Sequence, residues 1–181
     1  MAGAGSVHKA AGLLGGQLGF RLSDRIDIVG EGVGLLDVVS RQRLDMANLV
    51  GTYLQASQGG AVSSTVKAPA FYAGGGLHLM LTGVQRVRPF VAVGAGMARV
   101  TLQPAFTLGG ADVTASLPQY GVTLGSDLTG SSTKPAFAGG VGVRIAQGRW
   151  GIDADVGVIS IRTPGSPTNV LRTSVGLGFG F

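Results

Sequence analysis

The sequence predicts an all-β protein: an up-and-down antiparallel β-barrel that spans a membrane. Three observations support this fold class. Only 13% of the 181 residues are charged, whereas 45% are hydrophobic and 33 are glycine, so charges are too few for an ordinary soluble surface. No segment has the roughly 20 apolar residues of a spanning helix, and the other structure that pairs every backbone group in a bilayer is a closed barrel. Finally, hydrophobicity alternates with a period of two along segments of about ten residues, which suits tilted spanning strands.

The clearest alternation lies at the carboxyl end of the chain. From Leu171 to Phe181 the odd positions are apolar apart from Thr173, whereas the even positions are Arg172, Ser174 and three glycines. One face of this strand therefore suits hydrocarbon, and the other is small and polar. A soluble sandwich would turn its apolar face inward, but a face of glycines suits a narrow lumen. We therefore expect the apolar face to point outward.

Six other segments are predicted as strands with the same period. In five of them one face is apolar and the opposite face holds glycines and polar residues. In the sixth, Phe90–Thr101, neither face is polar, so the orientation of this segment is ambiguous. With the last strand they make seven clear strands. The six segments are Gly12–Leu22, Ile26–Val38, Phe71–Leu81, Phe90–Thr101, Ala136–Ile145 and Ile152–Ile161.

The links between these strands alternate in length. They are short after Leu22, Leu81 and Ile145, whereas residues 40–67 and 103–134 form long, polar links without a recognisable motif. Outer-membrane barrels have short periplasmic turns and longer outside loops. This order places the carboxyl terminus in the periplasm and any recognition function in the long loops.

Most aromatic residues lie near the ends of the predicted strands. Transmembrane barrels carry an aromatic girdle at each membrane interface, although aromatic residues also favour strands in general. We favour the girdle, because the central strand positions hold Val, Leu, Ala and Gly instead. The predicted girdle residues are Phe20, Phe71, Phe90, Phe137, Trp150, Phe179 and Phe181.

Three segments carry a resemblance to a known family. They are the hairpin GQLGFRLSDRIDIVGEGVG (16–34), the segment RVRPFVAVGAGMARV (86–100) and the terminal VLRTSVGLGFGF (170–181). They resemble the small Gram-negative outer-membrane β-barrels of the OmpA/OmpX-like, eight-stranded type, especially the glycine-rich ones. The resemblance implies location in the bacterial outer membrane, and it implies that terminal Phe181 is the signal for the barrel assembly machinery. Its motifs are residue patterns, which support fold and location more than activity.

The chain departs from this family in two respects. The family has an even number of strands, whereas seven are clear here, and Met1–Lys9 holds a single basic residue and no convincing signal peptide. Residues 1–181 are expected to form one outer-membrane barrel domain. Its first strand is expected either to be missing or to be an irregular or partial strand within residues 1–10.

Charged residues on the predicted inner faces are expected to pair with one another. Eight strands leave an interior that side chains just fill, so a structural plug of ion pairs is favoured over a catalytic or conducting interior. The predicted polar network of the lumen consists of Arg21, Asp27, Glu31, His78, Arg144, Asp153, Asp155 and Arg172.

No catalytic, cofactor-binding or metal-ligating residues are predicted. Gly94 and Gly96 mimic the start of a dinucleotide-binding motif, but Arg99 occupies the third glycine position and no helix follows. His8 and His78 are far apart and the chain has no cysteine, which leaves a metal site little support. Lipid A deacylases of similar size use a His and a Ser close together on one strand, and the residues after His78 do not match.

The net charge of +5 is interpreted as contact with lipid phosphates rather than with nucleic acid. Arg25, Arg86, Arg88 and Arg149 lie at the short turns, where they are expected to contact lipid phosphates; no motif indicates nucleic-acid binding. We predict a monomeric, non-enzymatic outer-membrane barrel with a structural or surface-interaction role and no large pore. Its expected partners are outer-membrane lipid, lipopolysaccharide and the assembly machinery. The alternatives are a lipid A-modifying barrel enzyme and a soluble lipocalin-like barrel that binds a small apolar ligand.

Overall fold

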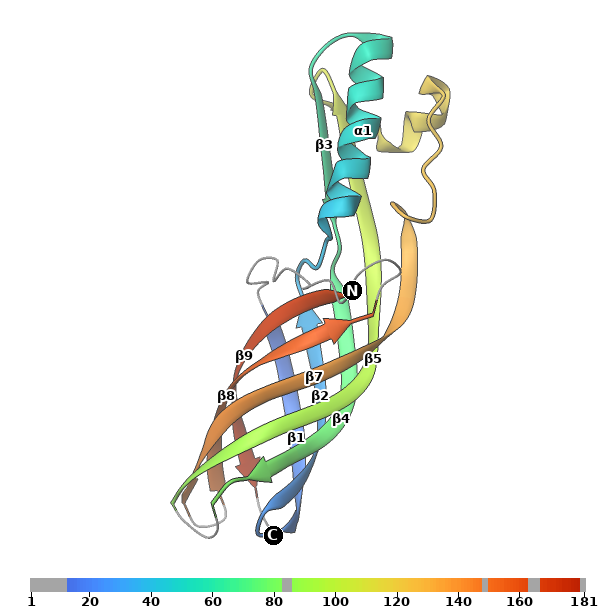
Figure 1. Cartoon of the computed structure of the whole chain (residues 1–181). Coiled ribbons are helices and arrows are strands. Elements are labelled where there is room, and N and C mark those ends of the chain that lie inside the picture. The colour runs from blue at the N-terminus through green and yellow to red at the C-terminus, as the bar shows by residue number, and fades with distance from the viewer. Residues whose placement is uncertain (1–12, 83–85, 148–149, 163–166, 180–181) are drawn as a thin grey trace, which may run out of the picture. The chain divides into compact units, whose positions relative to one another are not determined.

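The structure is a computed structural model that describes residues 13–82, 86–147, 150–162 and 167–179. The chain forms two compact units (Figure 1). The first lies within Met1–Leu36, Ala70–Arg99 and Thr133–Phe181, and the second within Asp37–Pro69 and Val100–Ser132. The expected first strand within residues 1–10 lies outside the described residues.

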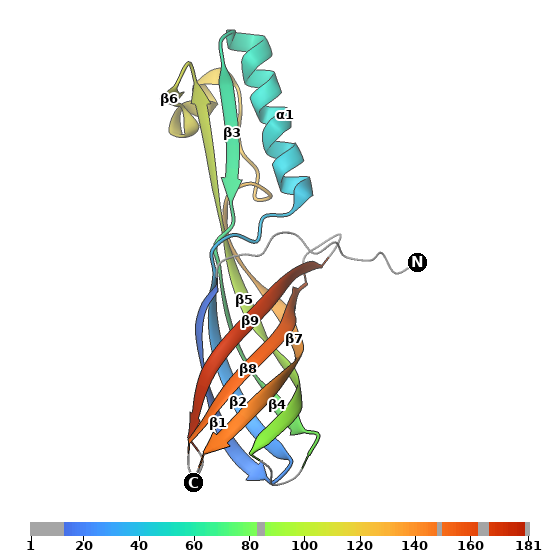
Figure 2. The ribbon, with the colours of Figure 1, turned by 90° about the vertical axis from the view of Figure 1, so that its left-hand side faces the viewer.

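The first unit is an antiparallel up-and-down sheet, as the sequence predicts. Its strand order is β1-β2-β4-β5-β7-β8-β9, so strands that follow one another in this unit are also neighbours in space. Figures 1 and 2 show the sheet curling around a central interior. Within the described residues no ladder joins β1 to β9, the two ends of this order. The strands are β1 (Leu13–Ser23), β2 (Ile26–Leu35), β4 (Ala70–Met80), β5 (Val87–Leu108), β7 (Gly130–Gln147), β8 (Trp150–Ile161) and β9 (Thr168–Phe179).

Each of the seven predicted strands overlaps one of these seven, and burial follows the predicted period of two. Strands β5 and β7 are longer than the predicted Phe90–Thr101 and Ala136–Ile145 and extend into the predicted link 103–134. In β8 every second residue from Gly151 to Ile161 is buried, and the residues between them are exposed, apart from half-buried Ser160. The strand whose orientation the sequence leaves ambiguous turns Phe90 and Ala92 inward and Met97 outward.

Glycines allow neighbouring strands of this unit to approach closely. A Cβ atom at Gly140 of β7 would lie 2.7 Å from the carbonyl oxygen of Val156, and one at Gly157 of β8 would lie 2.5 Å from that of Gly139. A real Cβ would force these strands apart. The glycines at these two positions therefore allow the close approach of β7 and β8.

The second unit gives the two long links a structure of their own. It contains helix α1 (Arg41–Gln58), strands β3 (Val62–Lys67) and β6 (Ala111–Asp112), the 3₁₀ helix η1 (Thr114–Tyr120) and the carboxyl end of β5. Strand β3 pairs with β5 from Val62 opposite Leu108 to Lys67 opposite Gln103. No helix in the described ranges has the length and hydropathy of a membrane-spanning helix.

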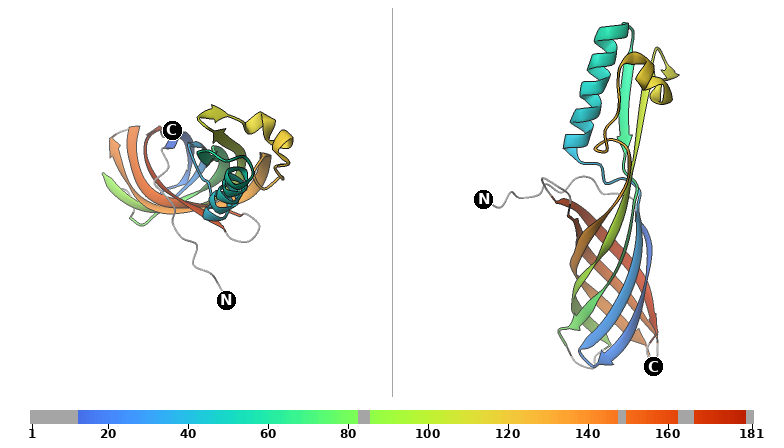
Figure 3. Two further views of the ribbon diagram at one scale, coloured as in Figure 1. Left: turned by 90° about the horizontal axis from the view of Figure 1, so that it is seen from above. Right: turned by 90° about the vertical axis from the view of Figure 1, so that its right-hand side faces the viewer.

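Helix α1 lies alongside β3 in every view (Figures 1, 2 and 3). It buries Ala47, Gly51 and Leu54 on one face, at the spacing that brings helical residues together. The hydroxyl of Ser64 on β3 donates a hydrogen bond of 2.9 Å to the side-chain oxygen of Asn48. Gly51 suits this packing, because a Cβ there would lie 3.2 Å from the Ser64 hydroxyl oxygen, closer than an ordinary van der Waals contact.

A polar turn supports the other end of this unit. The backbone N–H of Phe106 donates to the hydroxyl of Thr114 at 2.8 Å, and the N–H of Thr114 donates to Asp112 at 2.8 Å. Phe106 and Leu117 are almost completely buried. These bonds hold the start of η1 over the core of the second unit.

Candidate functional site

The candidate site is the interior of the first unit, where strand alternation buries ionisable side chains. Asp27 and Glu31 come from β2 and His78 from β4, while Arg144 comes from β7. Two acids of β8 and one arginine of β9 complete the set. Asp27, His78, Asp153, Asp155 and Arg172 are each less than 9% exposed. Charged groups are almost never this buried unless they are paired.

One cluster is built around Arg144. Its guanidinium donates two hydrogen bonds to Asp153, of 2.6 Å and 2.7 Å, and a third to Asp27. The side chains of Asp27 and Asp153 are each 3% exposed. Arg144 and Asp153 are directly opposite in the β7–β8 ladder, so the register sets up the two-pronged pairing that a planar guanidinium favours.

The second cluster is built around Arg172. It donates to Glu31 on β2 and, at 3.0 Å, to Asp155 on β8. Asp155 also accepts a hydrogen bond from the hydroxyl of Ser174, its ladder partner on β9. The two arginines thus tie β2, near the start of the strand order, to strands at its far end.

The clusters leave the interior with excess negative charge. Each contains one arginine and two carboxylates, so each has a formal charge of −1.

Arg88 is a third inward cation: it is 4% exposed and donates to the carbonyl oxygen of Asp24. The expectation that Arg88 contacts lipid phosphates is therefore wrong, because its side chain shares the inner face of β5 with Phe90.

His78 lies beside the Arg144 cluster. It faces Asp27 across the β2–β4 ladder, and its ring stacks on Phe90 with centroids 4.4 Å apart and planes 16° apart. Phe90 is 1% exposed, so the structure places this predicted girdle residue inside the unit. The reason is the register of β5, which points Phe90 and Ala92 toward the interior.

Two further residues differ from the sequence-based picture of the site. Arg21 is exposed next to the irregular register at the end of β1 and belongs to neither cluster. Tyr72 on β4 is completely buried and is not among the predicted residues of the polar network. Its position on the same face as His78, six residues away, is the signal that could have found it.

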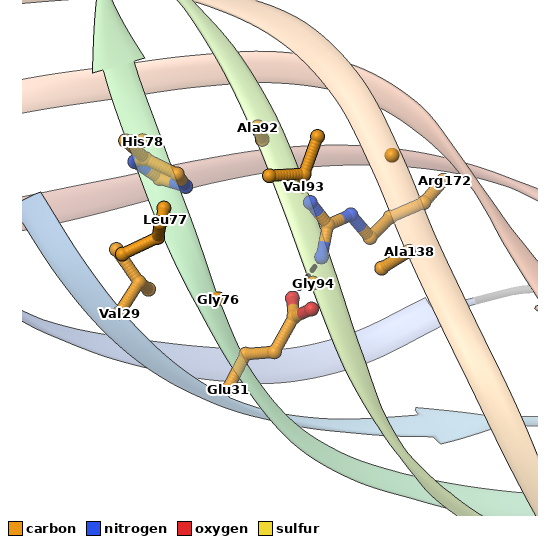
Figure 4. A pocket seen from close by; sticks show the side chains of 11 residues that line it. Val29, Glu31, Gly76, Leu77, His78, Ala92, Val93, Gly94, Ala138 and Arg172 are labelled. Carbon is orange, nitrogen blue, oxygen red and sulfur yellow. Dashed lines mark hydrogen bonds and ion pairs between the residues drawn. The ribbon is translucent and has the colours of Figure 1, made fainter.

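A small cavity of about 20 Å³ separates His78 from the second cluster (Figure 4). Glu31 and Arg172 line it, together with Ala92 and Ala138. Figure 4 shows His78 on one side and the Glu31–Arg172 ion pair on another. A second, larger cavity of about 460 Å³ lies between the first and last strands and is lined by residues that include Gln17, Glu31, Arg172 and Ser174.

The outer face of the unit is apolar and exposed. Four of the predicted girdle residues lie on it: Phe20 is 67% exposed, Phe71 56%, Phe137 49% and Trp150 61%. The side chain of Phe179 and the whole of Phe181, the predicted assembly signal, lie outside the described part of the chain.

Fold and interior together define a class of protein, namely an antiparallel up-and-down β-barrel with apolar residues outside and ion pairs inside. No protein-family model matches the chain, and no curated protein matches it in sequence. One solved structure that matches is Ail, the attachment invasion locus protein of Yersinia pestis. The match has a TM-score of 0.43 and 12% identity, and it covers 89% of this chain and 76% of Ail.

Proposed function

We propose that this protein is an integral barrel of the bacterial outer membrane with a structural or surface-interaction role and no enzymatic activity. The observation that carries the proposal is the inverted distribution of polarity. Outward residues such as Val141 and Val156 are 56% and 45% exposed, whereas Asp153 and Asp155 are 2% and 7% exposed. This arrangement suits a lipid-facing belt around a polar interior.

The same distribution argues against the soluble alternative. A lipocalin-like barrel would line its interior with apolar residues to hold an apolar ligand. Here the middle of the interior holds Arg144, Arg172 and their carboxylate partners. If the protein were soluble, water would contact the exposed apolar side chains of every strand, at a high cost in free energy.

We propose that the two arginine clusters plug the lumen. Four of their six ion-pairing side chains are at most 6% exposed, and they connect strands from opposite ends of the strand order. The larger cavity of about 460 Å³ is lined by residues at one side of the interior. A conducting pore of porin size does not fit this arrangement.

The surface-interaction role is assigned to the second unit. One segment of this unit lies between β2 and β4, and the other runs from the carboxyl end of β5 to the start of β7; outer-membrane barrels carry their outside loops in such long connections. The proposed partners of the barrel are outer-membrane lipid, lipopolysaccharide and the barrel assembly machinery, and it is proposed to act as a monomer.

Cell fractionation tests the proposal. Expressed in a Gram-negative host with an added signal peptide, the protein should sediment with the outer membrane, and release should require detergent. Unheated samples should migrate differently from boiled samples on a denaturing gel. Recovery as a folded monomer in the detergent-free soluble fraction would contradict the proposal.

A further inference from the structure

The small cavity next to His78 carries an inference that rests on the proposed polar plug. The cavity measures about 20 Å³ and is lined by His78, Glu31 and Arg172. A buried water needs at least roughly 10 to 15 Å³ for its centre and two to four polar partners. The volume therefore suits one water molecule. Figure 4 shows the side chains that line it.

Two of the lining residues present buried polar atoms without a partner among the described protein atoms. They are Nδ1 of His78 and Nε of Arg172, on side chains whose residues are 4% and 5% exposed. The other two nitrogens of the Arg172 guanidinium already donate to Glu31 and Asp155. Buried polar atoms are usually hydrogen-bonded, so each of these two atoms calls for a polar partner, and both residues line the same cavity.

The chemistry of the lining selects that group. It must accept a hydrogen bond from the Arg172 Nε–H, which excludes a metal ion or ammonium beside the guanidinium. It must also lie beside the negatively charged carboxylate of Glu31, which would repel an anion. It must also bond to Nδ1 of His78 whichever ring nitrogen carries the proton. Water alone accepts and donates in this way at this size.

We propose that the cavity is a binding site for one structural water that bridges His78 and Arg172. The water accepts from Arg172 Nε and bonds to His78 Nδ1, with the Glu31 carboxylate as its third partner. His78 stands opposite Asp27 in the β2–β4 ladder, so the bridge links the Arg172 cluster to a residue that lies beside the Arg144 cluster.

A double-mutant cycle tests the bridge. His78→Phe keeps a ring stacked on Phe90 but removes Nδ1, and Arg172→Lys keeps the charge but removes Nε. In the otherwise unchanged protein, refolded in detergent micelles, the two substitutions should be coupled by at least about threefold in the equilibrium constant for unfolding. Additive effects would overturn the proposal.

Filling the cavity distinguishes a bridging water from a direct interaction. Ala92→Val adds two methyl groups to the cavity lining and should abolish the coupling. Ala95→Val, on the exposed outer face of the same strand, is the matched control and should preserve it. Coupling that persists undiminished in the Ala92→Val background would overturn the bridge.

A crystal structure of the unchanged protein gives a second test that needs no variant. It should show a density peak within hydrogen-bond distance of both His78 Nδ1 and Arg172 Nε. An empty cavity would contradict the proposal. So would rotated side chains in which His78 and Arg172 find hydrogen-bond partners within the protein. These outcomes do not affect detergent extraction from the outer membrane, so failure of the bridge is distinguishable from failure of the proposed function.

Discussion

Arg144 is the side chain whose loss should cost the barrel most. It serves two carboxylates that are each 3% exposed, so Arg144→Ala leaves two buried negative charges without a cation. Removing one partner of a buried pair costs about 3 to 5 kcal/mol. The free energy of unfolding, measured with urea in lipid vesicles, should fall by about that amount.

Two matched variants show whether pairing is the cause. Arg21→Ala removes an exposed arginine and should change stability by less than about 0.5 kcal/mol. Glu31→Ala leaves Arg172 paired with Asp155 and should cost less than Arg144→Ala. Equal losses for the two arginine variants would mean that the Arg144 cluster does not stabilise the fold.

Asp112 gives a pH prediction outside the barrel strands. Hydrogen bonds from the hydroxyl and backbone N–H of Thr114 lower the pKa of this exposed carboxyl below its usual range. Because the folded pKa lies below the unfolded one, its contribution to stability is present at neutral pH and is lost as the pH falls through the folded pKa. An NMR titration should show the depressed pKa, and Thr114→Ala should raise it. An unchanged pKa in that variant would contradict the role of the hydroxyl.

At the scale of single residues, the alternation of apolar and polar positions alone predicted which ionisable residues of β2, β7, β8 and β9 face inward. It could not orient Phe90, because both faces of that strand are apolar and only its pairing with β4 decides. It also could not reveal that Arg88 bonds to the carbonyl of Asp24, a contact between residues far apart in the chain. The partners of each charge likewise depend on register, which the sequence leaves open.

At the scale of elements, the close approach of β7 and β8 depends on glycines at some of their inward-facing positions. A Cβ at Gly142 would clash with the ring of Phe90 and lie 2.7 Å from the carbonyl oxygen of Ala154 and 2.8 Å from Cβ of Asp155. Gly142→Ala should therefore destabilise the barrel by about 1 to 3 kcal/mol, as overpacking does. Vesicle-based urea unfolding measures the loss.

Gly30 provides the control for this substitution. It lies on the outer face of β2, and a Cβ there would meet nothing within 4 Å. Gly30→Ala should leave stability unchanged or raise it slightly, because alanine has less freedom to lose on folding. If both variants unfold alike, strand propensity rather than close approach governs these glycines.

The strands of the barrel could be predicted because each has a long, regular period of two. The second unit could not. Helix α1 buries only Ala47, Gly51 and Leu54, and exposed Leu49 and Tyr53 blur its apolar stripe. Strand β3 is short and rich in serine and threonine, so it resembles a loop until its partner on β5 is known.

At the scale of the whole molecule, the outward apolar face distinguishes a membrane protein from a soluble one. Val141 lies mid-strand on β7, opposite Val156, and is 56% exposed. In water, an exposed substitution of this kind changes stability by about 0.5 kcal/mol or less. In a bilayer, Val141→Arg should cost about 2 to 4 kcal/mol near the midplane. Leu49→Arg, at a residue 71% exposed on α1, is the control and should be nearly neutral. Unfolding from phospholipid vesicles measures both, and an equally neutral Val141→Arg would place this face of the barrel in water.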